Sequence, residues 1–325
     1  MAFIFGYSYI LQTESPSYGG AGFPAREARR LATLLILGVA DMFFLFSGDI
    51  LTTYAVLGAI TLASLHRATT RTSIGIAAAC LMFTTALILS SALLSKGGGA
   101  APIASDFHAA VALYRENAVS TLAARVREIP GRITGDIVMA PDVLAALIAG
   151  LVAGRGHVLE SGGTCRRFTS KTMWACLFVG LAGSYSLAAD QARRTPGKEY
   201  LVHLAIEVLT APALTAAYTL GVLSLLRFRK LEWVMQLLSA GGRMSLTNYL
   251  GQSLFFCLMF TGYGAGLYGR VGPFGTFVAA VLIYISGLYL SQLLLRRFQH
   301  GPIEWLVRFV TFMPERGIAL RQGRD

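Results

Sequence analysis

The chain has 325 residues, of which 54% are hydrophobic and only 14% are charged, and its formal net charge is +11. Its mean hydropathy is +0.58. Soluble domains are about 25% charged and disordered chains are poor in apolar residues, so this composition excludes both an ordinary soluble enzyme and a disordered chain.

Nine apolar stretches have the composition of membrane helices, and most also have the required length of about 20 residues. In chain order they are 1–12, 31–47, 50–65, 74–94, 136–154, 172–189, 200–226, 246–268 and 274–295. The first is short and apolar from its first residue, so we expect it to be the second half of a helix. The sequence predicts an all-α fold, a polytopic membrane helix bundle that forms one integral domain over 1–325.

The 28 basic residues are divided unevenly between alternate loops, with 19 of them on the side that includes the C-terminal tail. Because Lys and Arg concentrate on cytoplasmic loops, the C-terminus is predicted inside and the N-terminus outside. The positive charge is thereby explained without nucleic acid, and no such partner is expected. An outside N-terminus that begins within a helix predicts that one upstream helix is missing.

Two further segments have amphipathic spacing. The first, near 105–129, is predicted to be one helix lying on the outer surface. The second, near 301–312, is predicted to lie on the inner surface, with Glu304 and Arg308 paired at i,i+4. The four cysteines have no metal-like spacing, so no metal site is expected.

Ionisable side chains within apolar helices are costly and are therefore candidates for function. Asp41, Asp142, His203 and Glu207 all lie in outer halves of predicted spans, and Asp49 lies at an outer helix end. His203 and Glu207 are spaced i,i+4 and project from one helix face. A carboxylate beside an imidazole is suited to proton transfer, so these five residues are the predicted acid/base group.

These residues also have structural interpretations. Asp49 and Asp136 can cap helix N-termini, where a carboxylate accepts free backbone N–H groups. Asp142 can do the same if Pro141 interrupts its helix. His203 lies near the membrane interface, where a histidine needs no functional explanation.

The inner side carries a different motif at the start of the span 246–268. Arg243 precedes a helix N-terminus, with Asn248 and Gln252 one and two turns further on. Helix N-termini beside an arginine favour phosphates, so these three residues are the predicted cofactor-binding group. Alternatively, Arg243 reflects the cytoplasmic charge bias, while Asn248 and Gln252 form hydrogen bonds between helices.

Three stretches together resemble the YeiB-like integral membrane family, domain of unknown function 418. They are Gly48-Asp49-Ile50-Leu51, the run from Gly242 to Gln252 that reads GRMSLTNYLGQ, and Gly301-Pro302-Ile303-Glu304-Trp305. Phe3-Ile4-Phe5-Gly6 resembles a stretch in the family's second helix. Family members usually begin with a helix carrying an Asp-x-x-Arg-Gly motif, which is absent here, and they carry His where this chain has Asp41.

The family is distantly similar to transmembrane acyltransferases of the heparan-glucosaminide acetyltransferase type. This resemblance implies acyl transfer from cytosolic acyl-CoA, as a donor substrate rather than a bound cofactor, to a small-molecule or glycan acceptor at the outer face. It also implies location in a bacterial inner membrane, with the lipid bilayer as partner. The alternatives are a proton-coupled transporter or exporter, favoured by the prolines at 141 and 212, and a non-catalytic membrane subunit.

Overall fold

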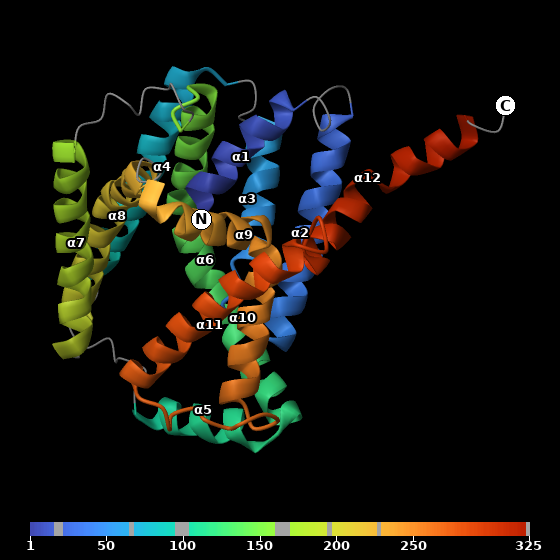
Figure 1. The fold of residues 1–325 in the computed structure, drawn as a ribbon. Coiled ribbons are helices and arrows are strands. Elements are labelled where there is room, and N and C mark those ends of the chain that lie inside the picture. The colour runs from blue at the N-terminus through green and yellow to red at the C-terminus, as the bar shows by residue number, and fades with distance from the viewer. Residues whose placement is uncertain are drawn as a thin grey trace. The chain divides into compact units, whose positions relative to one another are not determined.

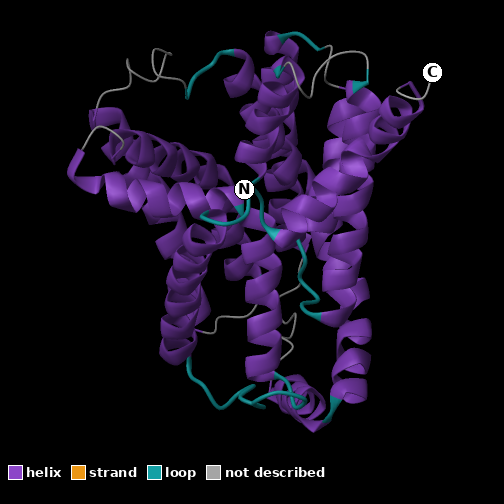
Figure 2. Cartoon of the chain, turned by 45° about the vertical axis from the view of Figure 1, so that its right-hand side comes forward, coloured by secondary structure: helices purple, strands orange, loops and turns teal. Residues whose placement is uncertain are grey.

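The structure is a computed structural model that describes residues 1–15, 22–64, 68–94, 104–159, 170–193, 197–225 and 229–322. Figure 2 shows only helices and connecting loops in these ranges, which confirms the predicted all-α fold. The helices are α1 (Ala2–Glu14), α2 (Phe23–Phe44), α3 (Leu51–Ser64), α4 (Thr70–Leu94), α5 (Ala104–Glu116), α6 (Ala118–Arg155), α7 (Ser170–Arg193), α8 (Lys198–Leu225), η2 (Arg229–Leu231), α9 (Glu232–Arg243), α10 (Ser245–Phe260), α11 (Pro273–Leu295) and α12 (Pro302–Gln322).

Five of these helices, α4, α6, α7, α8 and α11, are long and apolar enough to cross a membrane. Large apolar side chains also face outward along them. On α7, for example, Trp174, Phe178 and Tyr185 are 62%, 77% and 75% exposed. Such apolar surface is characteristic of contact with lipid. The described chain is therefore a helical, membrane-like protein with several apolar helices.

The predicted number of about nine spans is not confirmed. The other four predicted segments correspond to α1, α2, α3 and α10. Three of these helices have 13, 14 and 16 residues, and at 1.5 Å per residue even the longest of the three extends only about 24 Å. The remaining one, α2, has 22 residues but includes Arg26, Glu27, Arg29 and Arg30 in its first half.

The predicted outer helix near 105–129 is wrong as a single element, because the chain divides it at Asn117. The Asn117 side chain accepts a hydrogen bond from the Ser120 backbone N–H at 2.9 Å, and the Ser120 hydroxyl accepts one from the Asn117 N–H at 3.0 Å. This reciprocal arrangement is a capping box, which ends one helix direction and begins another. Residues 118–129 therefore belong to the start of the 38-residue helix α6.

The two prolines that were expected to interrupt helices, at 141 and 212, do not do so. Pro141 lies within continuous α6, and Pro212 lies within continuous α8. A proline removes one backbone donor, and the rest of each helix keeps its own hydrogen bonds. Asp136 and Asp142 consequently lie in the middle of a helix, and neither caps an N-terminus.

Two boundaries near the C-terminus also differ from the prediction. The span predicted to continue to 268 ends at Phe260, and residues 261–272 form turns in which Gly266 and Gly269 have positive φ angles of 61° and 69°. Helix α9, predicted as a loop, is a separate helix whose buried residues Leu237, Ala240 and Gly241 follow helical spacing. The predicted inner helix near 301–312 corresponds to the first half of α12.

The chain divides into two compact units. Unit 1 comprises Met1–Ala21, Leu57–Ile103 and Thr134–Phe228, and unit 2 comprises Gly22–Val56, Ala104–Ile133 and Arg229–Asp325. Two of the divisions fall within helices, one in α3 and one in α6. The expectation of one integral membrane domain stays a prediction.

Within unit 1, α8 packs against both α4 and α7, and Figure 1 shows α7 and α8 side by side. Ile88, Ala205 and Val208 form a buried apolar cluster between α4 and α8, which Met139 of α6 joins. In unit 2, α12 packs on α2, and α11 packs on α9 and α10.

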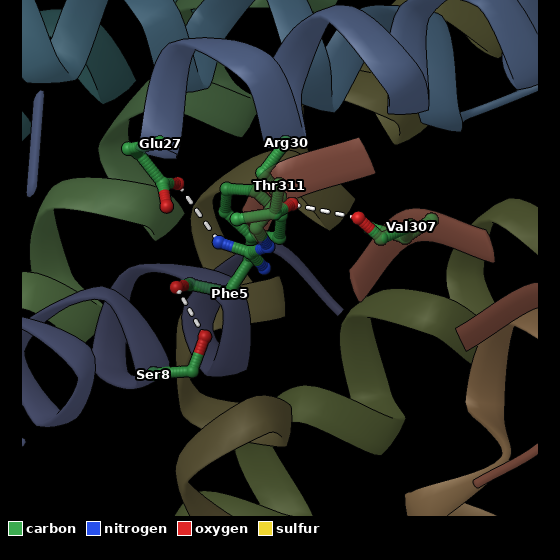
Figure 3. A network of polar contacts seen from close by, with 6 residues as sticks. All are labelled: Phe5, Ser8, Glu27, Arg30, Val307 and Thr311. Atoms are coloured by element: carbon green, nitrogen blue, oxygen red, sulfur yellow. Dashed lines mark hydrogen bonds and ion pairs between the residues drawn. The ribbon is translucent and has the colours of Figure 1, made fainter. Parts of the chain in front are cut away.

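Polar contacts accompany the packing of α2 on α12 in unit 2. On α2, Arg30 forms an ion pair with Glu27 at 2.8 Å, and Glu27 is only 1% exposed (Figure 3). Arg29 donates a hydrogen bond to the Thr311 carbonyl of α12 at 3.0 Å. A basic segment of α2 is thereby tied to α12 within unit 2.

Helices α1 and α6 approach each other closely within unit 1, at Gly6 and Gly150. A Cβ atom at Gly6 would collide with the Leu147 carbonyl oxygen, and one at Gly150 would collide with the Phe3 carbonyl oxygen. Ile148 and Leu151 beside the crossing are 0% exposed. Small residues permit this kind of backbone-to-backbone contact between apolar helices.

We predict that Gly150→Ala destabilises the protein, by about 1–3 kcal/mol as is typical of overpacking, because the obstacle is backbone. Thermal unfolding of the purified protein in detergent measures the effect. Gly221→Ala on α8 is the matched control, since a Cβ there meets nothing within 4 Å. Equal melting temperatures for the two variants would contradict the packing described.

Candidate functional site

A cavity of about 550 Å³ lies in unit 2. One face of α10 supplies six of its lining residues, Tyr249, Gln252, Ser253, Phe256, Cys257 and Phe260. Their spacing of three and four residues places them on a single helical stripe. The remaining lining comes from the turn after α2, from α5, α6 and α11, and from the turns after α10. The volume is in the range of small-molecule sites, about 300–1,000 Å³.

Asp49 lies beside this cavity, two residues before α3. Its Oδ2 accepts hydrogen bonds from the Thr52 N–H at 2.8 Å and the Thr52 hydroxyl at 2.9 Å, so the predicted capping role is present. Its Oδ1 accepts a hydrogen bond from the Tyr249 hydroxyl at 3.0 Å. Gly38 on α2 allows this approach, since a Cβ there would meet both Asp49 and Thr52. Asp49 thus links α3 to the cavity-lining face of α10.

Asp41 is the predicted site residue with the most unusual surroundings. Because α2 ends at Phe44, Asp41 lies in its last turn, and its backbone carbonyl accepts the N–H groups of Leu45 and Phe46, each at 2.8 Å. The side chain is 2% exposed, and neither carboxyl oxygen has a hydrogen-bond partner among the described residues. Ser253 and Asp49 lie close enough to interact with the carboxyl, although outside ordinary hydrogen-bond geometry, and Arg125 acts on it electrostatically.

Buried polar groups are nearly always hydrogen-bonded, and an exception requires an explanation. A carboxylate in the last turn of a helix also faces the negative end of the helix dipole, which is unfavourable. Folding alone therefore gives no reason for Asp41 to be acidic. Its neighbour Ser253 lines the cavity, which connects the buried carboxyl to that space through one side chain.

Arg125 of α6 is a buried cation in the cavity wall, 4% exposed. Its guanidinium donates to the backbone carbonyl of Phe44 at the end of α2. It also donates to the Cys257 sulfur at 2.9 Å and to the Tyr263 hydroxyl at 3.3 Å. The contact with α2 satisfies a terminal carbonyl and places positive charge at the helix C-terminus, where it is stabilising.

Tyr114, Glu128 and Ser47 form a second polar group in the cavity wall. Glu128 accepts a hydrogen bond from Tyr114 at 3.0 Å and from Ser47 at 2.7 Å. Burial, and secondarily the Glu128 carboxylate, raise the pKa of Tyr114 well above its usual value. Tyr114 therefore remains a neutral hydroxyl and donates to Glu128 throughout the physiological range.

The two C-terminal motifs identified in the sequence meet at the start of α10. Glu304 of α12 accepts hydrogen bonds from the N–H groups of Leu246 at 2.8 Å and Thr247 at 2.9 Å, and from the Thr247 hydroxyl at 2.5 Å. A Cβ at Gly301 would collide with Glu304 and crowd Thr247, so glycine permits the contact. The predicted Glu304–Arg308 pair is replaced by this cap, and Arg308 contacts His300 at 3.2 Å instead.

The three predicted cofactor-binding residues do not converge. Arg243 is exposed and donates to the Gln299 carbonyl at 3.1 Å, whereas Asn248 donates to Ser291 of α11 at 2.9 Å, the interhelical bond considered as the alternative. Gln252 lines the cavity. The N-terminal amides of α10 that were expected to bind phosphate are already bonded to Glu304. Binding of acyl-CoA by these residues stays a prediction.

The five predicted acid/base residues separate into two groups. Asp41 and Asp49 belong to unit 2, while Asp142, His203 and Glu207 belong to unit 1. In unit 1, Asp142 of α6 lies close enough to Glu207 of α8 for electrostatic interaction. His203 has a buried Nδ1 with no hydrogen-bond partner among the described residues. Within those residues, no group of three or more His, Cys, Asp and Glu side chains could hold a metal ion.

Sequence reasoning did not select Arg125, Glu128 and Arg132, although all three line the cavity. Their spacing of three and four residues was an available signal, because it places all three on one face of α6. The sequence places Arg125 and Glu128 in the predicted surface helix near 105–129 and Arg132 in the outer segment that follows it, where such charges need no explanation. Cys257 and Ser253 were missed because a thiol or hydroxyl in an apolar span is unremarkable in the sequence.

The fold and the composition define a multi-pass, helical, membrane-like protein with a polar cavity in one unit. The model of the family described as "Protein of unknown function (DUF418)" matches residues 153–314, about half of the chain. The chain belongs to this DUF418 family, as the resemblance in its motifs predicted.

Similarity to three bacterial proteins supports this assignment. "Uncharacterized protein YxaH" of Bacillus subtilis (strain 168) is 26% identical over 98% of this chain and 79% of its own length. "Uncharacterized 39.9 kDa protein in amylase 3'region" of Bacillus acidopullulyticus is 29% identical over 56% of each chain. "Uncharacterized protein YeiB" of Escherichia coli (strain K12) is 36% identical over 22% of this chain and 18% of its own length. No solved structure matches the chain.

We predict that Glu304→Ala destabilises the protein by about 1–3 kcal/mol, because the backbone donors of Leu246 and Thr247 lose their acceptor. Glu304→Gln retains an acceptor oxygen and should recover part of this loss. Thermal unfolding in detergent compares the two variants, and hydrogen exchange of the first turn of α10 localises the effect. Unchanged exchange in Glu304→Ala would show that this cap contributes nothing.

Proposed function

We propose that the protein is a membrane-embedded acyltransferase whose acceptor binds in the unit 2 cavity. The observation that carries the proposal is Asp41, a buried carboxyl with no hydrogen-bond partner among the described residues and with the cavity-lining Ser253 as its neighbour. A general base needs an oxygen that is not already committed to a structural hydrogen bond. Asp49, whose oxygens are occupied by Thr52 and Tyr249, has instead a positioning role.

In this proposal, an acceptor hydroxyl or amine loses its proton toward Asp41, by way of the Ser253 hydroxyl. The acceptor oxygen or nitrogen then attacks the thioester carbonyl of acyl-CoA. A new bond to the acyl carbon forms, the carbon–sulfur bond breaks, and the proton is returned to the CoA thiolate. A base contributes about 10²–10⁴-fold to such a reaction.

The donor and the location are part of the proposal. The family resemblance supports acyl-CoA as donor, a small molecule or glycan as acceptor, and the inner membrane of a bacterium as location. The excess of basic residues on one set of loops supports a cytoplasmic C-terminus. Arg243 is exposed, and it remains available to an anionic donor on that side in addition to its bond to Gln299.

We predict that Asp41→Asn lowers acyl transfer at least about 100-fold, because it removes the base while preserving size. The assay measures transfer of label from acetyl-CoA to a panel of hydroxyl and amine acceptors in proteoliposomes, across a range of pH. Asp41→Glu, which retains a carboxyl, should recover activity with an altered pH profile. Glu14→Gln, at a half-exposed carboxylate near His157, is the control. Full activity of Asp41→Asn would show that Asp41 is not the general base.

A specific observation favours proton-coupled transport as the second candidate. Asp142 and Glu207 interact between two apolar helices of unit 1. His203 lies one turn from Glu207, and its Nδ1 has no hydrogen-bond partner among the described residues. Ionisable groups gathered in membrane helices are typical of proton pathways. The continuity of α6 and α8 through their prolines removes the argument from broken helices.

If transport is the function, we predict that Glu207→Gln abolishes solute flux driven by a pH gradient, with no acyl-CoA consumed. Flux into proteoliposomes of stated internal pH measures this, and Glu199→Gln in the exposed first turn of α8 is the matched control. Flux that is unchanged by Glu207→Gln would exclude this proton pathway.

A further inference from the structure

The wall of the unit 2 cavity contains a buried arginine, Arg125, on which the Asp41 carboxyl acts electrostatically without forming an ion pair in the described part of the chain. Arg125 is 4% exposed, and its guanidinium contacts only neutral groups, which are backbone carbonyls of α2, the Cys257 thiol and the Tyr263 hydroxyl. Among the described residues it forms no ion pair with a carboxylate. A buried charge without a paired counter-charge is costly, so a structure that retains one usually has a use for it.

A second arginine lies in the same wall. Arg132 follows Arg125 by seven residues, two turns along the same face of α6, and it also lines the cavity. It is exposed, and its side chain forms no hydrogen bond or ion pair in the described part of the chain. Its guanidinium would lie 3.5 Å from a Cβ at Gly48, in the turn after α2, which places it at that side of the cavity.

The carboxylates near the cavity either accept hydrogen bonds from other side chains or lie outside the cavity lining. Glu128 lies between the two arginines in sequence, but its oxygens accept the hydroxyls of Ser47 and Tyr114. Asp49 is bonded to Thr52 and Tyr249. Asp41 acts electrostatically on the same region but does not line the cavity. The groups of α6 that can still bind a ligand in the cavity are therefore the positively charged guanidinium groups of Arg125 and Arg132.

The rest of the lining is largely apolar and aromatic. Phe256 and Phe260 of α10 stack with ring centroids 5.9 Å apart, and Tyr114 and Tyr268 stack at 4.8 Å. Phe46 and Leu45 add further apolar surface from the turn after α2. Apolar walls with a few oriented polar groups are typical of sites that take a small organic molecule.

We infer that the cavity is a binding site for an amphiphilic anion, a small molecule with one phosphate or carboxylate group on an apolar or aromatic body. Arg125 and Arg132 bind the acidic group, and the aromatic walls contact the body. A guanidinium fork matches the geometry of phosphate and carboxylate oxygens. The cavity is the same one in which the proposed function places the acceptor. The inference concerns only which class of molecule binds there, so it can hold even if the protein does not transfer acyl groups.

Cys257 provides a reporter, because its thiol lines the cavity and contacts Arg125. In a full-length variant with Cys80, Cys165 and Cys176 replaced by Ala, modification of Cys257 by methyl methanethiosulfonate is followed by intact mass spectrometry. The probes are phenyl phosphate, benzylammonium with the opposite charge, and inorganic phosphate without an apolar body. No acyl-CoA is present, so the result is independent of any transfer activity.

We predict that phenyl phosphate, at ten times its dissociation constant, slows modification of Cys257 about tenfold. Arg125→Gln should weaken this binding about tenfold or more, because a hydrogen-bonded charge is lost. Arg132→Gln should weaken it a few-fold, as expected of a charge at a rim. Arg132 forms no hydrogen bond or ion pair with the residues that the structure describes, so its variant remains informative if Arg125→Gln fails to fold. Arg296→Gln, an exposed arginine outside the cavity, should have no effect.

Three results would overturn the inference. Equal protection by benzylammonium would show that the site does not select negative charge. Equal protection by inorganic phosphate would show that the apolar body is not recognised. Binding of phenyl phosphate that is unchanged in Arg132→Gln and in a folded Arg125→Gln would remove the arginines from the site.

Discussion

The bond between Glu304 and the first turn of α10 is the contact on which the unit 2 site depends. A helix N-terminus presents free N–H groups, and here one carboxylate from α12 accepts two of them together with the Thr247 hydroxyl. Helix α10 supplies six cavity-lining residues from one face, so the position of its first turn sets where these side chains lie. The cavity therefore depends on a residue outside its own lining.

That contact explains why two separate motifs of the sequence occur in one chain. Gly301 permits the close approach, Glu304 provides the acceptor, and Thr247 provides the donors. The region around Thr247 alone is typical of a phosphate-binding helix start, because free N–H groups attract anions. The sequence does not reveal that an anion from the same chain already lies there, since the two residues are 57 positions apart.

The sequence predicted the helical class, the apolar helices and most of their boundaries, because hydrophobic length is visible locally. It failed at α5 and α6, where a two-residue capping box at Asn117 and Ser120 redirects the chain within one amphipathic pattern. Among site residues, Asp41 was predicted because acidity in an apolar helix is conspicuous. Arg125 was not predicted, because its burial depends on contacts with α2 and α10 that only folding creates.

The crossing of α1 and α6 has a genetic consequence. At Gly6 and Gly150 the opposing atoms are backbone carbonyls, so no smaller side chain on the partner helix can make room for a larger residue. Where two side chains meet, a smaller residue at one position often compensates for a larger residue at the other. Such compensation is impossible between Gly6 and Gly150. Suppressors of a Gly150 substitution should therefore arise at residues that alter the crossing of the helices, and reversion to glycine should dominate any selection.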